Sequence, residues 1–230
     1  MNQKLNELYK SKWDLLKEKF DIILKDDNLI TKPAKPLLLY IDNEYQNADI
    51  RLLVFGQETN QWCPEILDMD IDKIQSGYDS WFNGGECWTY GKFYKGIENF
   101  IKLLQEKYPN KKIKTVWNNT IKIGIRDGKG CPPDYIYHIE RKFFNVTAQE
   151  LEILQPNLVL FFSGPNYDEI LKNNFNELEF DTFLKFSGRQ ISKVKINNVK
   201  FSYRTYHPNY FRYNNKMTQY YKAIIDDLNF

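Results

Sequence analysis

The segment YRTYHPNYF, residues 203–211, contains His207, one of two histidines in a chain of 230 residues. An imidazole set before a proline can be held as a hydrogen-bond donor that is already in place when a reaction begins, and such a donor lowers a barrier most. A histidine in a turn can equally do no more than close the loop through a hydrogen bond to the backbone. The residue types of this segment alone leave both interpretations open.

Three other segments place small or polar residues directly after a short apolar run. They are residues 50–55 (IRLLVF) before Gly56, Gln57 and Glu58, residues 112–117 (KIKTVW) before Asn118 and Asn119, and residues 158–162 (LVLFF) before Ser163 and Gly164. An apolar run that stops at a glycine or a turn residue is typical of a buried parallel strand opening into a loop. Because ligands of parallel sheets bind outside the carboxyl ends of the strands, we expect these segments to meet His207 in one cleft.

Hydrophobic periodicity predicts the elements that would hold these strand ends in place. Apolar residues at steps of three and four predict an amphipathic helix over residues 3–25. Further helices are expected over about 93–108, 138–154, 167–175 and 215–228, with a strand pair over 193–206 that turns at Asn197-Asn198 and a long functional loop over 57–91. Strands that alternate with helices predict a three-layer α/β/α sandwich with a mainly parallel central sheet, as one domain over residues 1–230.

The composition argues against several classes of protein. No run is long and apolar enough for a membrane span, and the charged N-terminal residues do not fit a signal peptide, so we expect a cytoplasmic protein without a membrane partner. Three cysteines without a C-x-x-C pair argue against a disulfide framework and against a four-cysteine zinc or iron-sulfur site. We expect no metal and no other cofactor. We also expect the protein to be a monomer.

Basic residues gather in one segment although the net charge is only +2. Residues 183–222 contain nine Lys or Arg, ten Phe or Tyr, and no Asp or Glu. Positive charge with interleaved aromatics suits a phosphate backbone with unstacked bases. The same pattern fits a solvated basic face whose aromatic residues belong to the core, and the segment alone does not decide between them.

Taken in order, the four strand ends resemble the uracil-DNA glycosylase superfamily over roughly residues 50–225. The matching residues are Gly56-Gln57-Glu58 for the family's first Gly-Gln-Asp loop, Asn119, with Asn118 as the alternative, for the asparagine of the second strand, Leu154 to Gly164 for the third strand, and His207-Pro208-Asn209 for its His-Pro-Ser loop. Each piece alone occurs by chance, and the order and spacing of all four carry the resemblance. Gly85-Glu86-Cys87-Trp88 is similar, more weakly, to the family's segment with a base-stacking aromatic.

The resemblance implies a hydrolase that cleaves the N-glycosidic bond of an extruded DNA base, either uracil-like or damaged. His207 would donate to a carbonyl oxygen of the leaving base, while Glu58 would orient the attacking water and offset the positive charge of the sugar. Glu58 is one methylene longer than the family's aspartate, so its carboxylate cannot occupy the same place without a backbone shift. It could instead face solvent or cap a helix.

Base recognition and DNA binding fall to other residues in this scheme. The side-chain amide of Asn119, or of Asn118, would pair with the polar edge of the base, and Trp88 would stack on its face. Gly56 and Gln57 would complete the base pocket. The residues assigned to DNA are Gly164, Pro208, Asn209, Tyr210, Phe211, Arg204, Arg212 and Lys216. The two aromatics among them would fill the gap left by the base and the three cations would contact phosphates, although these residues could equally pack on the C-terminal helix.

Two departures from the family leave other functions open. Thr59 and Asn60 stand where the family has proline and tyrosine, and that tyrosine blocks the methyl group of thymine, so specificity for uracil is not implied. A fold relative without glycosylase activity, binding DNA or a nucleotide-like ligand in the same cleft, is the alternative. A generic doubly wound domain with a small-molecule ligand is the third possibility, favoured if the strand ends do not converge.

Overall fold

A six-stranded sheet forms the centre of the molecule, in the order β2-β1-β3-β6-β5-β4. β1 (Ile50–Glu58), β2 (Ile113–Ile121), β3 (Leu158–Phe161) and β6 (Phe201–Thr205) are parallel, and β5 (Ile191–Lys195) and β4 (Glu179–Thr182) extend the sheet in antiparallel pairs. The computed structural model describes residues 1–64, 68–213 and 216–230, with the backbone alone at 211–213. The α/β class and the mainly parallel sheet predicted from the sequence are confirmed.

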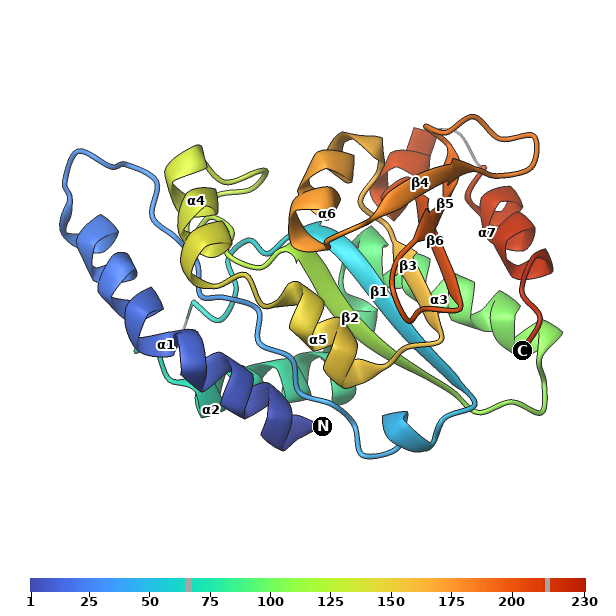
Figure 1. Cartoon of the computed structure of the whole chain (residues 1–230), viewed down its shortest axis with the longest axis horizontal. Helices are drawn as coiled ribbons and strands as arrows, with labels where there is room; N and C mark the ends of the chain where they lie inside the picture. Colours follow the sequence, from blue (N-terminus) through green and yellow to red (C-terminus); the bar gives the residue numbers. More distant parts are fainter. Residues whose placement is uncertain (65–67, 214–215) are drawn as a thin grey trace.

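Helices α5 (Thr147–Leu154) and α6 (Asp168–Asn174) lie over one face of the sheet (Figure 1). Phe175, directly after α6, packs edge-on against Phe55 of β1 and Phe161 of β3, with ring centroids 5.8 and 5.9 Å away. A strand that is buried on both faces needs apolar residues at every position, which is why these strands read as continuous apolar runs.

Helices α3 (Gly91–Lys107) and α7 (Met217–Asp226) lie over the opposite face (Figure 1). The aromatic rings of Phe100 in α3 and Tyr221 in α7 pack on Phe162, just after β3, at centroid distances of 6.3 and 5.3 Å. Layers of helices on both sides of one sheet are compatible with the expected sandwich.

The N-terminal helix α1 (Asn2–Lys25) confirms the helix predicted over 3–25. Its apolar stripe is buried where it packs against α2 (Ile71–Tyr78), α4 (Asp134–Phe143) and α5. None of the helices in the described parts of the chain has the length and apolar character that a membrane crossing requires.

The two longest strands pair in register through their carboxyl ends. Phe55 lies opposite Asn118, and Gly56 lies opposite Asn119. Because successive side chains of a strand point to opposite faces, Phe55 and Asn118 belong to the α5 and α6 side, and Asn119 belongs to the α3 side.

Several boundaries differ from the prediction. β1 continues through Glu58 and β2 through Ile121, so the expected strand-end loops begin three and four residues later than predicted. The single helix expected over 138–154 is two helices, α4 and α5, because the chain between them turns Phe144 and Val146 fully into the core. The region expected as a long loop contains α2 and short helical turns, and β4 was not foreseen. The hairpin of β5 and β6 is confirmed, with Asn198 at a φ of 62°.

Candidate active site

A cavity of about 810 Å³ opens at the carboxyl ends of the parallel strands. Glu58 from the end of β1, Asn119 from β2 and His207 from beyond β6 all line it. Three of the four predicted strand ends therefore converge. The fourth strand end, after β3, contributes no lining residue among those described. It is connected to the site through Gln57, which lines the cavity and whose side chain donates to the Ser163 carbonyl at 2.8 Å.

The turn that carries His207 is held by helix α3. The imidazole stacks on Phe93, with centroids 5.2 Å apart and planes inclined by 13°. Pro208 lies so close to Gly96 that a Cβ on Gly96 would be 2.4 Å from the proline Cγ. The two contacts place the His207 ring and its proline turn against helix α3.

Hydrogen bonding and burial determine the chemical state of His207. Its Nδ1 accepts the backbone N–H of Asn209 at 3.2 Å, so the neutral ring carries its proton on Nε2. Burial lowers the pKa of His207 to about 4, which keeps the imidazole neutral at pH 7. Among the described residues no protein atom accepts the Nε2–H, and the group is available as a donor.

Glu58 is partly buried and lines the cavity, and it neither faces open solvent nor caps a helix. Its Oε2 accepts a hydrogen bond from the Tyr167 hydroxyl, and its Oε1 accepts one from Asn60 Nδ2 at 3.3 Å. A carboxylate has about four lone-pair sites, so two remain for a water or a ligand.

Asn119 is only 5% exposed, and its amide has a defined orientation at the cavity wall. Oδ1 accepts the Trp117 Nε1–H at 3.1 Å, and Nδ2 donates to the Thr59 hydroxyl at 2.8 Å, which itself donates to the Ile121 carbonyl at 3.1 Å. Because the indole N–H can only donate, the amide cannot be turned over. A Cβ on Gly56 would be 2.3 Å from the Asn119 Oδ1, so glycine is required at that position.

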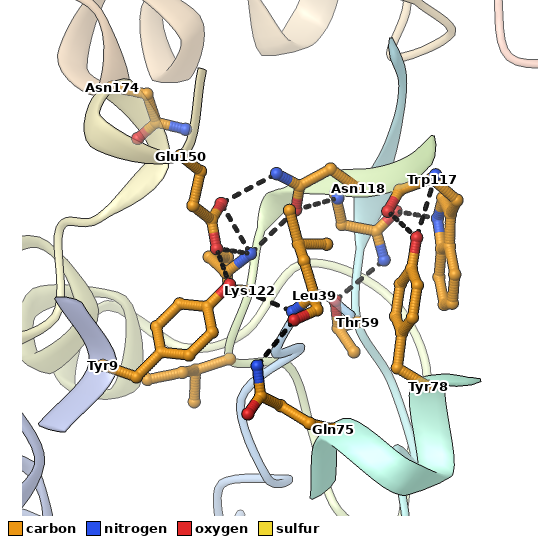
Figure 2. Close-up of polar contacts among 12 residues, drawn as sticks. Tyr9, Leu39, Thr59, Gln75, Tyr78, Trp117, Asn118, Lys122, Glu150 and Asn174 are labelled. Atoms are coloured by element: carbon orange, nitrogen blue, oxygen red, sulfur yellow. Dashed lines mark hydrogen bonds and ion pairs between the residues drawn. The ribbon is translucent and has the colours of Figure 1, made fainter. Parts of the chain in front are cut away.

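Asn118, the alternative base-contacting residue, lies on the other side of the sheet, and that prediction is wrong. Its side chain is fully buried, donates to Glu150 Oε2 at 2.9 Å and accepts from Lys122 Nζ at 2.8 Å (Figure 2). Glu150 in turn accepts a hydrogen bond from the Tyr9 hydroxyl at 2.6 Å. β2 runs through both asparagines as a strand, and its pleat sends them to opposite faces.

Trp88 does not line the cavity, and the stacking role predicted for it is not supported by its position. The indole packs on Phe82 and Tyr94, with ring centroids 5.4 and 6.4 Å away. Aromatic residues that do line the cavity include Trp81, Tyr90 and Phe93. Trp81 comes from the helical turn Asp79–Asn83, and Tyr90 and Phe93 come from the start of α3, and no sequence motif marked any of the three.

Arg204, predicted to contact phosphate, is 2% exposed and serves the core. Its Nε and Nη2 donate to the two carboxylate oxygens of Asp168, each at 2.9 Å, and Nη2 also donates to the Gly188 carbonyl at 2.6 Å. The prediction is wrong because the guanidinium is buried against Asp168. This acidic partner lies on α6, 36 residues earlier in the sequence, so the basic segment itself does not reveal it.

Two lysines of the basic segment are likewise paired with acidic residues from outside it. Lys193 lies 2.7 Å from Asp227, and Lys195 lies 3.0 Å from Asp181. The solvated-face interpretation fits these lysines better than a phosphate-binding stripe does. Exposed lysines that line the cavity are Lys92 and Lys129, which the sequence reasoning did not select.

The remaining predicted residues fall into three groups. Gly164, at a φ of 75°, and Pro208 shape the two loops and do not line the cavity among the described residues, whereas Asn209 does. Tyr210 is 49% exposed and stacks on Tyr206 at 4.2 Å, and Lys216 is exposed just before α7. The side chains of Phe211 and Arg212 lie outside the described residues.

Within the described residues no group of three or more His, Cys, Asp or Glu side chains is arranged to hold a metal ion. A scan of the chain against models of protein families found no match, and a search of curated proteins found none either.

Proposed function

We propose that this chain is a member of the uracil-DNA glycosylase superfamily in fold and a hydrolase that removes a base from DNA. The observation that supports this most is the convergence of a carboxylate, a fixed amide and a neutral imidazole donor on one cavity at the carboxyl ends of parallel strands. The parallel order β2-β1-β3-β6 places these groups there.

In this mechanism the leaving base is stabilised by His207. When the bond between the base and the anomeric carbon breaks, its electron pair stays on the base, and negative charge develops on a carbonyl oxygen. The Nε2–H donates to that oxygen, and the stacking on Phe93 holds it in place before the reaction. The neutral imidazole donates this hydrogen bond and keeps its proton, so the base leaves as an anion.

Glu58 acts on the other reaction partner. A water oxygen forms the new bond to the anomeric carbon, and a free lone pair of the Glu58 carboxylate orients that water and accepts its proton. The negative charge of Glu58 also stabilises the positive charge that develops on the sugar. The free N–H and lone pair of the Asn119 amide read the polar edge of the base.

The rim of the cavity supplies a small set of groups for the rest of the ligand. Lys92 and Lys129 provide positive charge, and Tyr90, which is 66% exposed, provides an aromatic face. The pairing of Arg204, Lys193 and Lys195 with acidic residues favours one alternative, in which the cavity takes a nucleotide-like ligand without a long DNA footprint.

The test is a cleavage assay with oligonucleotides that carry uracil, mismatched, deaminated or alkylated bases, in single-stranded and duplex form, and with the free nucleosides. We expect base release by the native chain and a loss of roughly a hundredfold or more in rate for His207→Ala and for Glu58→Ala. His138→Ala and Glu98→Ala, at exposed positions on α4 and α3, are the matched controls and should keep the native rate.

Two outcomes would contradict the proposal. Base release that neither variant lowers would exclude the mechanism. Failure to cleave any substrate, with salt-sensitive binding of DNA or nucleotide retained, would support the binding alternative.

A further inference from the structure

The Glu58 carboxylate is held in the cavity by hydrogen bonds from other parts of the chain. A glutamate side chain has three torsions, and its carboxylate is not fixed by the strand that carries it. Both carboxylate oxygens nevertheless accept hydrogen bonds, Oε2 from the Tyr167 hydroxyl and Oε1 from Asn60 Nδ2 at 3.3 Å. The two donors come from different strand ends, so they hold the carboxylate from two directions.

The amide of Asn60 has a single possible orientation. Its Oδ1 accepts the backbone N–H of Ile125 at 3.0 Å, and a backbone N–H can only donate. The Nδ2 group must therefore face Glu58. At 3.3 Å this is the weaker of the two contacts, which leaves the Tyr167 hydroxyl as the main constraint on the carboxylate.

Tyr167 is itself placed by the chain that follows β3. It ends the 3-10 helix Pro165–Tyr167, and its backbone N–H donates to the Gly164 carbonyl at 3.2 Å. Gly164 has φ 75° and ψ 166°, a conformation that glycine alone adopts readily, and its N–H donates to the Thr205 carbonyl at 3.0 Å. The end of β3 is thus tied to the end of β6 and aims the phenol at Glu58.

Tyr167 contacts the Glu58 carboxylate without lining the cavity itself. Glu58 and Asn60 line the cavity, whereas Tyr167 is not among the described residues that do so. Burial, with a further contribution from Glu58, raises the pKa of the Tyr167 phenol above its ordinary value, so the hydroxyl remains a donor at any physiological pH. A ligand in the cavity would meet Glu58 and not the tyrosine.

We propose that Tyr167 is the positioning residue for Glu58, holding its Oε2 so that the remaining lone pairs face the cavity; this rests on the glycosylase function proposed above. The extra methylene of Glu58 is then matched by a donor from the β3 loop. The Gly164 turn acts in the site by placing Tyr167, and not by touching DNA.

The first test compares Tyr167→Phe with Tyr108→Phe. Tyr108 is a matched control because its partly buried hydroxyl donates to the Leu228 carbonyl at 2.6 Å. It lies at the C-terminal end of α3, whereas the N-terminal end of that helix lines the cavity. We expect Tyr167→Phe to lower kcat roughly ten- to hundredfold and to leave KM within about twofold, since the water and not the base is misplaced. Tyr108→Phe should leave kcat unchanged, with a similar shift in Tm.

The second test asks whether Tyr167 acts through Glu58. In a Glu58→Ala background, adding Tyr167→Phe should not lower the residual rate further, because no carboxylate remains to be positioned. A kcat that stays native in Tyr167→Phe, or that falls by the same factor with and without Glu58, would overturn the proposal.

A third measurement needs no activity. A hydroxyl proton held by a carboxylate exchanges slowly and gives a downfield proton resonance, which should be present in the native chain and absent from both Tyr167→Phe and Glu58→Ala. If the native chain cleaves no substrate, the glycosylase function fails, and this resonance alone then decides whether Tyr167 holds Glu58. Its absence from the native spectrum would refute the positioning role.

Discussion

Asn118 and Asn119 are neighbours in β2 with the same side chain, and the two faces of the sheet use them differently. The Asn118 amide is occupied by protein groups, donating to Glu150 and accepting from Lys122 and from the Asn119 backbone N–H at 2.9 Å. The Asn119 amide uses one donor and one acceptor on Thr59 and Trp117, and one of each remains. The face of the strand, and not the residue type, decides which asparagine can bind a ligand.

The face of the sheet that carries Asn118, which we call the closed face, is built around a buried ion pair. Lys122 Nζ lies 2.8 Å from Glu150, both side chains are fully buried, and Tyr9 and Asn118 complete the network (Figure 2). Burial lowers the pKa of the Lys122 ammonium, and Glu150 opposes that shift. Such a network is stable only while every member has its partners.

The largest effect is expected when the closed face loses one charge. Lys122→Met keeps the volume of the side chain but leaves the Glu150 carboxylate buried without a cation, and we expect a loss of about 3–5 kcal/mol in the free energy of unfolding. Urea unfolding measures it. Lys73→Met is the control, since the ion pair of Lys73 with Asp68 at 3.1 Å is exposed to solvent and should contribute little to the free energy of unfolding. A Lys122→Met variant as stable as the native chain would show that the network does not stabilise the sheet.

The face that carries Asn119 is the open face, because it borders the cavity. On this face, the contribution of His207 to the free energy of unfolding should depend on pH. Its pKa is about 4 when folded and 6.5 in the unfolded reference, so between these values the unfolded chain binds the proton and the folded chain does not. Stability should therefore fall as the pH is lowered from 8 to 4, by about 3 kcal/mol from this group. The measurement is the difference between the native chain and His207→Gln across that range. Glu140, whose pKa burial raises to about 7, titrates in both proteins and cancels in the difference. A difference that is flat with pH would contradict the burial of the imidazole.

Substituting each asparagine separately tests the comparison most directly. The expected changes in the free energy of unfolding are the smallest of the three predictions. Asn118→Ala should reduce the free energy of unfolding by about 1–3 kcal/mol, because Lys122 and Glu150 lose a partner, while the folded fraction keeps its cleavage rate. Asn119→Ala should lower that rate roughly tenfold or more, with a smaller loss of stability. Reversal of the two outcomes would mean that the base site had been assigned to the wrong face.

The elements that depend on local pattern could be predicted from the sequence. The amphipathic stripe of α1, the apolar runs of β1 and β3, and the hairpin of β5 and β6 are each contained in a few consecutive residues. Placing Glu58 and Asn119 near His207 also followed, since parallel strands align their carboxyl ends on one side.

The predictions that failed concern residues whose position depends on a contact with a residue distant in the sequence. Arg204 lies in a segment without acidic residues, yet Asp168 on α6 pairs with it in the core. The choice between the two asparagines depended on whether β2 continues for four residues beyond Trp117, which its pairing with β1 determines. The contact of Tyr167 with Glu58 joins residues 109 positions apart, and no local pattern announces it.

The fit of Pro208 against Gly96 has a mechanical consequence. A side chain on residue 96 would collide with the proline, so the turn and helix α3 lie in direct contact. The same helix carries Phe93 and Tyr94 on the wall of the cavity. Because the imidazole also stacks on Phe93, we expect any tilt of α3 that widens the cavity to displace His207 as well.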